Sequence, residues 1–151
     1  MKREKVVCTL GTSDRTIEQF VDLLRAYGIK RVIDVRRFPT SKFDHFKREN
    51  LAKQLEWAGC SYDFFGDRLG GYRNGGYDNY MKTDLFRKTL SEVERLARRE
   101  PALILCAERL PWRCHRRFIA GELRERGWKI IHILEKGKTW EPREQLDLLK
   151  G

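Results

Sequence analysis

Short apolar runs alternate with segments of helical periodicity along almost the whole chain. The runs that indicate strands are residues 5–10, 31–35, 60–65, 102–106 and 128–134. Between them, apolar residues recur every three or four positions, as in helices that bury one face. Parallel strands need crossover connections, which helices usually supply. We therefore predict a single α/β domain, residues 1–151, with a mostly parallel open sheet of about five strands and helices on both faces.

Capping residues and a proline indicate where helices begin. Thr16 and Gln19 have the spacing of a capping box, and Thr83 precedes a periodic segment that extends to about residue 99. Pro111 suits the first turn of a helix, so we expect a helix to start there. Residues 140–150 are expected to form a short outer helix.

The charge of the chain limits the class of partner. Lys and Arg total 32 while Asp and Glu total 22, which gives a net charge of +10. This excess favours an anionic small molecule or nucleic acid as partner.

No apolar run reaches the roughly 20 residues of a membrane span, and the first strand leaves no room for a signal peptide, so we expect a cytoplasmic protein without a membrane partner. Scarce Asn and Gln beside abundant Arg, Lys and Glu are typical of thermophile proteins.

Polar residues gather where the predicted strands end. Open α/β sheets bind ligands beyond the carboxyl ends of their strands, and Ser13, Asp34, Arg36 and Glu108 lie at such ends. Ser13 and Arg36 are candidates to bind an anion. Asp34 and Glu108 are candidate acids, bases or a metal-binding pair, whereas the alternative for Asp34 is a structural pair with an arginine.

The segment after the most apolar strand combines basic and nucleophilic residues. Arg113 and Arg116 lie near an expected helix start, where free N–H groups also favour anions, although a basic turn that only faces water has the same pattern. The same surroundings lower the pKa of a thiol, so Cys114 is a candidate nucleophile, redox thiol or metal ligand, or else a packed residue. His115 is a candidate acid or base. Cys106, at the end of the apolar strand, is expected to be a small core residue.

The longest irregular stretch, residues 66–80, contains five glycines and three tyrosines. Irregular stretches of this length in compact domains are often functional. Gly70, Gly71, Tyr72 and Arg73 are therefore candidates for a mobile flap that stacks a base or holds a phosphate. The alternative is a surface turn with tyrosines packed beneath it.

Five motifs occur together in one order. They are Gly11-Thr-Ser-Asp-Arg, Asp34-Val-Arg-Arg-Phe-Pro39, Leu69-Gly-Gly, Tyr80-Met and Cys106-Ala-Glu followed by Cys114-His115-Arg116. This set resembles the domain of unknown function 488 family over nearly the whole chain. Thr12 stands where the family pattern has His, so an essential base is not expected at that position. The resemblance implies that these motifs belong together, and it brings no established reaction.

Three hypotheses about function follow. The first is an enzyme that acts on a phosphorylated substrate, a nucleotide or nucleic acid, for which Arg116→Ala is expected to weaken anion binding while barely changing stability. The second is a non-catalytic nucleic-acid-binding module. The third is a metal or redox site built on Cys106, Cys114 and His115, although their spacing is not the Cys-x2-Cys of a zinc ribbon. The sequence indicates no particular cofactor.

Overall fold

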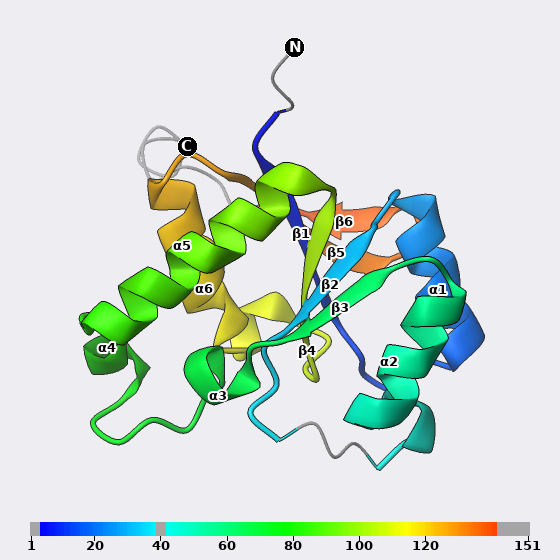
Figure 1. The fold of residues 1–151 in the computed structure, drawn as a ribbon, viewed down its shortest axis with the longest axis horizontal. Helices are drawn as coiled ribbons and strands as arrows, with labels where there is room; N and C mark the ends of the chain where they lie inside the picture. Colours follow the sequence, from blue (N-terminus) through cyan, green and yellow to red (C-terminus); the bar gives the residue numbers. More distant parts are fainter. Residues whose placement is uncertain (1–3, 39–41, 142–151) are drawn as a thin grey trace.

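A six-stranded sheet forms the centre of the molecule (Figure 1). The computed structural model describes residues 4–38 and 42–141. The strands lie in the order β3-β2-β4-β1-β5-β6. Their bounds are β1 Val6–Gly11, β2 Arg31–Asp34, β3 Ser61–Phe64, β4 Ala102–Cys106, β5 Lys129–Glu135 and β6 Lys138–Trp140. All pairings among β1 to β5 are parallel, which confirms the predicted α/β fold with a mostly parallel sheet.

The sixth strand corrects the expected number of about five. β6 pairs antiparallel with β5, with His132 opposite Trp140, after a turn that contains Gly137 at φ 75°. Trp140 was expected to begin an outer helix, and it ends this edge strand instead. Its ring stacks on the His132 ring at 5.4 Å between centroids. The rest of that expected helix, from residue 142 on, lies outside the described residues.

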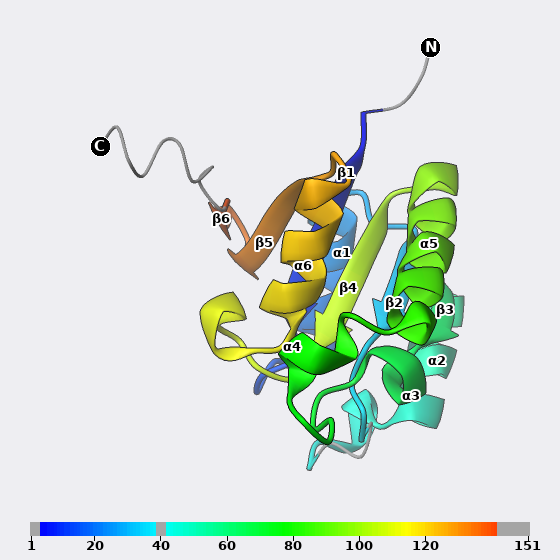
Figure 2. The ribbon, with the colours of Figure 1, turned by 90° about the vertical axis from the view of Figure 1, so that its left-hand side faces the viewer.

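Helices cover both faces of the sheet, as predicted (Figures 1 and 2). The longer helices are α1 Ile17–Ala26, α2 Arg48–Trp57, α5 Asp84–Arg99 and α6 Arg116–Glu125. One core cluster joins α1 and α2 to the sheet through Phe20, Leu24, Leu51 and Leu55. A second cluster joins α5 and α6 to the opposite face. β4 is buried along its whole length between them, so the central position of this strand follows from its apolar sequence.

Side-chain caps mark the starts of α1 and α5. Thr16 Oγ1 accepts a hydrogen bond from the Gln19 N–H at 3.1 Å, and Gln19 Oε1 accepts one from the Thr16 N–H at 2.9 Å, which completes the predicted capping box. Thr83 caps α5 through the Phe86 N–H at 3.2 Å. The prediction for Pro111 needs correction, because this residue starts only the 3-10 helix η2, Pro111–Arg113. Cys114 is extended, with φ −123° and ψ 148°, so the chain leaves the helical conformation before α6 begins.

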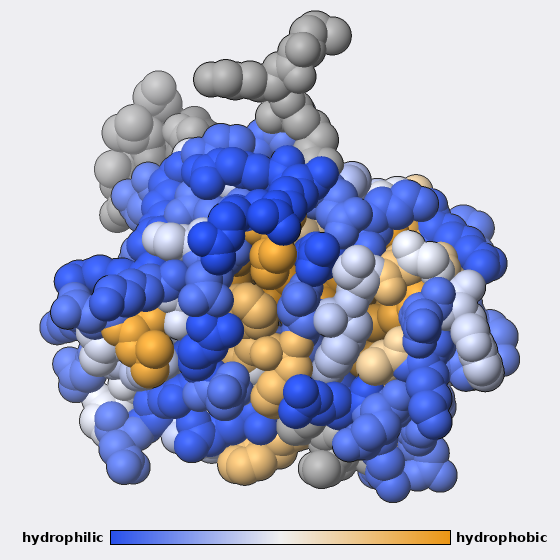
Figure 3. All heavy atoms as spheres, viewed as in Figure 1, coloured by the Kyte–Doolittle hydropathy of each residue, from blue (hydrophilic) through white to orange (hydrophobic). Residues whose placement is uncertain are grey.

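The stretch expected to be irregular contains two short helices, α3 Gly66–Leu69 and α4 Tyr77–Tyr80. A 3-10 helix, η1 Asp44–Phe46, precedes α2. Within the described residues no helix is long and apolar enough to cross a membrane. The surface in Figure 3 is mainly hydrophilic, with hydrophobic side chains gathered between α5 and α2, where the edge strand β3 lies.

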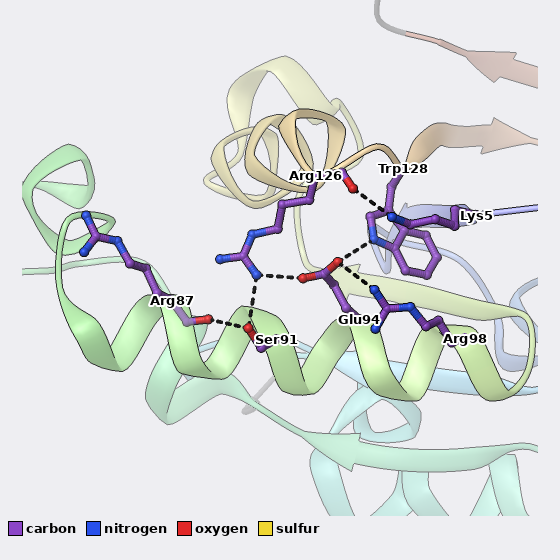
Figure 4. Close-up of polar contacts among 7 residues, drawn as sticks. All are labelled: Lys5, Arg87, Ser91, Glu94, Arg98, Arg126 and Trp128. Atoms are coloured by element: carbon purple, nitrogen blue, oxygen red, sulfur yellow. Dashed lines mark hydrogen bonds and ion pairs between the residues drawn. The ribbon is translucent and has the colours of Figure 1, made fainter.

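A buried carboxylate holds α5 against α6 (Figure 4). Glu94 of α5 accepts hydrogen bonds from Arg126 Nη1 at 2.6 Å and from Trp128 Nε1 at 2.9 Å. Burial alone would raise the pKa of Glu94, but the hydrogen bonds from Trp128 and Arg126 and the charges of Arg126 and Arg98 lower it below its ordinary value. The network therefore stabilises the helix pair while Glu94 stays ionised.

Candidate functional site

A cavity of about 620 Å³ opens at the carboxyl ends of β2 and β4. Its lining comes from the loop after β2, the loop after α3 and the segment between β4 and α6: Arg36, Arg37, Phe38, Gly71, Tyr72, Cys106, Ala107, Glu108, Arg113, Cys114 and His115. A neighbouring cavity of about 320 Å³ shares Arg36, Phe38 and Ala107 with it. Both cavities lie at the carboxyl ends of the strands, where the sequence predicts a ligand site. A separate cavity near Asp14, Arg109 and Lys136 has no cysteine or histidine in its lining.

Two cysteines lie together at the base of the larger cavity. The Sγ atoms of Cys106 and Cys114 are 2.9 Å apart and share a hydrogen. This hydrogen bond is the main cause that lowers the pKa of Cys114 to about 4, against the opposing effect of burial. Burial raises the pKa of Cys106, which is the deeper of the two. Both cysteines line the cavity, and their contact lowers the pKa of Cys114 and raises that of Cys106.

His115 and a main-chain amide also contact the sulfur of Cys114. His115 Nδ1 lies 3.6 Å from Cys114 Sγ, and it further lowers the pKa of Cys114. His115 Nε2 lies 3.3 Å from the Val35 carbonyl oxygen. Since a carbonyl only accepts, Nε2 is the donor in this contact. The ring is thereby oriented with Nδ1 toward the sulfur of Cys114. The N–H of Arg116 also points at Cys114 Sγ, at 3.5 Å.

Arg116 is buried beneath the cavity instead of facing it. Its side chain is 0% exposed. Nη1 donates to Cys106 Sγ and to the Glu108 carbonyl, both at 2.6 Å, and Nη2 donates to the Arg109 carbonyl at 3.0 Å. This guanidinium holds the loop after β4 in place. The sequence predicted that Arg116→Ala barely changes stability. Because the side chain is buried and donates three hydrogen bonds, we now expect this substitution to destabilise the fold.

Asp34 and Arg36 form a buried pair. Asp34 is fully buried and accepts hydrogen bonds from Arg36 Nε at 2.9 Å and Nη2 at 2.8 Å, and from the Tyr62 hydroxyl. Arg36 Nη1 donates to the Phe46 carbonyl at 2.6 Å. Of the two alternatives left open by the sequence, this geometry favours the structural pair. Asp34 does not line the cavity, whereas Arg36 does.

Two other arginines present free charge to the cavity. Arg37 lines it, and its buried Nη1 has no hydrogen-bond partner in the described structure. Arg113 also lines it, is exposed, and makes no side-chain hydrogen bond or ion pair with the described residues. The sequence analysis missed Arg37. Two adjacent arginines after a strand could have indicated it. Neighbouring side chains in an extended chain point to opposite sides, so only one of the two arginines can reach Asp34.

The remaining strand-end candidates are spread over the site. Glu108 is exposed and lines the larger cavity, while its Oε1 accepts a hydrogen bond from the Leu110 N–H at 3.1 Å. Ser13 lines the neighbouring cavity and the separate one near Asp14, but not the larger cavity, and it donates to Asp14 at 3.3 Å. Among the described residues, no group of three or more His, Cys, Asp or Glu side chains is placed to hold a metal ion.

The four flap candidates divide into two pairs. Gly71 and Tyr72 line the cavity, and Tyr72 has a φ of 60°. Gly70 packs so closely on Arg37 that a Cβ there would overlap the arginine side chain. Arg73 donates to the Gly70 carbonyl at 2.9 Å and to the Asp67 carbonyl at 2.7 Å, so it holds its own loop and does not line the cavity.

Comparison with known proteins gives a family and no reaction. No curated protein and no solved structure matches the chain. One family model, described as a domain of unknown function, DUF488, matches residues 16–123. That range holds the loops after β2 and β4 and thus every residue that lines the larger cavity. The chain belongs to the DUF488 family.

Proposed function

We propose that this protein is an enzyme that hydrolyses a phosphate ester of a nucleotide or nucleic acid, with the Cys114 thiolate as nucleophile. One observation carries the proposal: Cys114 Sγ, which lies against Cys106, His115 and the Arg116 N–H, lines the same cavity as Arg37, whose Nη1 has no hydrogen-bond partner among the described residues. Thiolates are the reactive form of cysteine, and guanidinium groups bind phosphate oxygens. An isolated structural cysteine needs neither feature.

The residues around Cys114 supply distinct roles. Arg37 and Arg113 neutralise the phosphate oxygens, and Arg113 is the more exposed of the two. His115 is oriented by the Val35 carbonyl and lies beside the nucleophile, where it transfers protons. Cys106, Arg116 and Asp34 are positioning residues, since they act through Cys114, the loop after β4 and Arg36 respectively.

The reaction takes place in two displacements. Cys114 Sγ attacks phosphorus, so that a sulfur–phosphorus bond forms while the bond from phosphorus to the ester oxygen breaks, and that oxygen takes a proton from His115. Water then attacks the phosphorus and gives a proton to His115. The sulfur–phosphorus bond breaks, which releases phosphate and restores the thiolate.

The test compares two serine substitutions. Cys114→Ser removes the thiolate. Cys60→Ser is the matched control, because the half-buried Cys60 thiol donates a hydrogen bond to the Ile29 carbonyl and lies outside the cavity. Phosphate release is measured from nucleoside monophosphates and from a 5′-phosphorylated single-stranded oligonucleotide. We expect Cys114→Ser to lose about 10³-fold or more of the rate and Cys60→Ser to keep it. Rapid quenching of the wild-type reaction should yield a phosphorylated Cys114 peptide.

Two results would reject this function. One is a Cys114→Ser variant that releases phosphate as fast as the wild type. The other is a wild-type protein that binds the oligonucleotide, loses it steeply with salt and releases no phosphate from any of these substrates. The second result would favour the non-catalytic nucleic-acid-binding module, for which log K falls by about 0.7 to 0.9 per phosphate for each tenfold rise in salt.

A further inference from the structure

Two aromatic side chains stand exposed at the mouth of the cavity. Phe38 is 65% exposed and Tyr72 is 85% exposed, and both line the cavity that holds Cys114. Their ring centroids are 6.0 Å apart with planes inclined by 38°. Removal of apolar surface from water is favourable, so two rings left in water are an unused source of binding energy. They form an aromatic platform, which we define as Phe38 and Tyr72.

The platform is held in place by the backbone around it. Phe38 follows β2, whereas Tyr72 follows α3, so the two rings come from distant parts of the chain. Gly70 packs directly on Arg37, which fixes the distance between the two loops. Tyr72 is one of two non-glycine residues in the described ranges with a positive φ, the other being Ser13. Such a backbone conformation is unfavourable for a side chain other than glycine, and residues that adopt it cluster at ligand sites.

A cationic group lies next to the platform. The guanidinium carbon of Arg37 is 5.8 Å from the Phe38 ring centroid, and its buried Nη1 has no hydrogen-bond partner within residues 4–38 and 42–141. Cys114 and His115 line the same cavity. The cavity thus offers a flat apolar surface at its mouth and positive charge beside the nucleophile. Its volume of about 620 Å³ is in the range of sites for ligands of nucleotide size.

These features select one class of substrate. A sugar phosphate or an inorganic polyphosphate would fill the charged part and leave both rings in water. A nucleotide has a planar base at one end and a phosphate at the other, and a base stacked on an aromatic side chain contributes about 1–3 kcal/mol. We propose that Phe38 and Tyr72 stack the base of a nucleotide whose phosphate lies at Arg37. This inference rests on the proposed function for the position of the phosphate.

Binding measurements test the platform separately from the chemistry. Titration calorimetry on the full-length Cys114→Ser protein compares adenosine 5′-monophosphate, ribose 5-phosphate and phenyl phosphate. We expect the nucleotide to bind about 5- to 150-fold more tightly than ribose 5-phosphate, the range that stacking of one base supplies. Phe38→Leu and Tyr72→Asn should each reduce that ratio toward one and leave the affinity for ribose 5-phosphate unchanged. Asn is chosen because it tolerates a positive φ.

Two control substitutions complete the design. Trp57→Leu removes an aromatic ring that is 78% exposed on α2, outside the cavity, and should leave every affinity unchanged. Arg37→Gln should weaken all three ligands, since each has a phosphate. Equal affinities for nucleotide and ribose 5-phosphate would overturn the platform, and phenyl phosphate bound as tightly as the nucleotide would overturn the nucleotide class.

The failures of the two proposals are distinct. If the nucleotide binds with the expected dependence on Phe38 and Tyr72 while the wild type releases no phosphate, the platform stands and hydrolysis is rejected. If the wild type hydrolyses ribose 5-phosphate and adenosine 5′-monophosphate with equal kcat/KM, and platform substitutions change neither, hydrolysis stands and the platform is rejected.

Discussion

The burial of Arg116 predicts a large loss of stability when its charge is removed. Arg116→Met keeps most of the side-chain volume but deletes three hydrogen bonds, one to Cys106 Sγ and two to the Glu108 and Arg109 carbonyls. Hydrogen bonds from a charged donor contribute about 1.5–3 kcal/mol each. The cost of keeping the charge out of water offsets part of this contribution. We therefore expect a net destabilisation of about 3 kcal/mol.

Thermal unfolding followed by circular dichroism measures this effect. In a chain of this length about 3 kcal/mol corresponds to a fall in Tm of roughly 6–12 °C. Arg113→Met is the matched control, because Arg113 is exposed and makes no side-chain hydrogen bond with the described residues, and its Tm should stay within about 2 °C of the wild type. If Arg116→Met unfolds at the same temperature as this control, the guanidinium does not hold the loop after β4 and the reasoning fails.

Three further predictions concern the thiols and a buried histidine. Cys106→Ala removes the hydrogen bond that does most to lower the pKa of Cys114, so alkylation of Cys114 by iodoacetamide at pH 6 should slow. Cys106→Ser should restore part of the rate. An unchanged rate in Cys106→Ala would contradict the role of Cys106 in lowering this pKa. Hydrogen peroxide should oxidise Cys114 to a sulfenic acid. The Cys106 thiol then attacks the sulfenic sulfur, so that a disulfide forms while the sulfur–oxygen bond breaks and the hydroxyl group leaves as water. Peptide mapping without reductant detects the disulfide, and a sulfinic acid at Cys114 with Cys106 still reduced would argue against the pair. Burial, followed by the charges of Arg116 and Arg124, lowers the pKa of His132 to about 3, so the unfolded chain gains a proton below about pH 6.5 that the folded chain does not. Stability should therefore fall as pH drops from 6.5, by up to about 1.4 kcal/mol per pH unit, and urea unfolding of His132→Gln between pH 5 and 7 should show a shallower slope; parallel slopes would refute the prediction.

Local patterns in the sequence predicted most of the sheet and helices. Buried parallel strands are mainly apolar runs, so β1, β2, β4 and β5 could be placed without knowledge of their neighbours. β6 could not, because its three residues, Lys138–Trp140, are all exposed and carry no periodic signal. Pro111 misled the prediction because a 3-10 helix and an α-helix accept proline equally at their first position.

The candidate site was predicted in its position and less completely in its members. Cys114, His115, Glu108 and Arg113 were found because unusual residue types follow a strand, and all four line the cavity. The division of roles among the arginines depends on which side chain meets a buried partner. Arg116 is buried because two carbonyls and a thiol converge on it, and a sequence gives no record of that convergence.

The order of the strands could not be predicted from the sequence, and this order explains where the cavity forms. β2 and β4 are adjacent, with Asp34 opposite Leu105, so their loops leave the sheet side by side. The chain from β2 leads to α2 on one face, whereas the chain from β4 leads to α6 on the other. Loops that diverge to opposite faces leave a crevice between them, the position at which open α/β sheets bind ligands. The same adjacency brings the Val35 carbonyl of one loop to His115 of the other, so the crevice and the orientation of its histidine have a common origin.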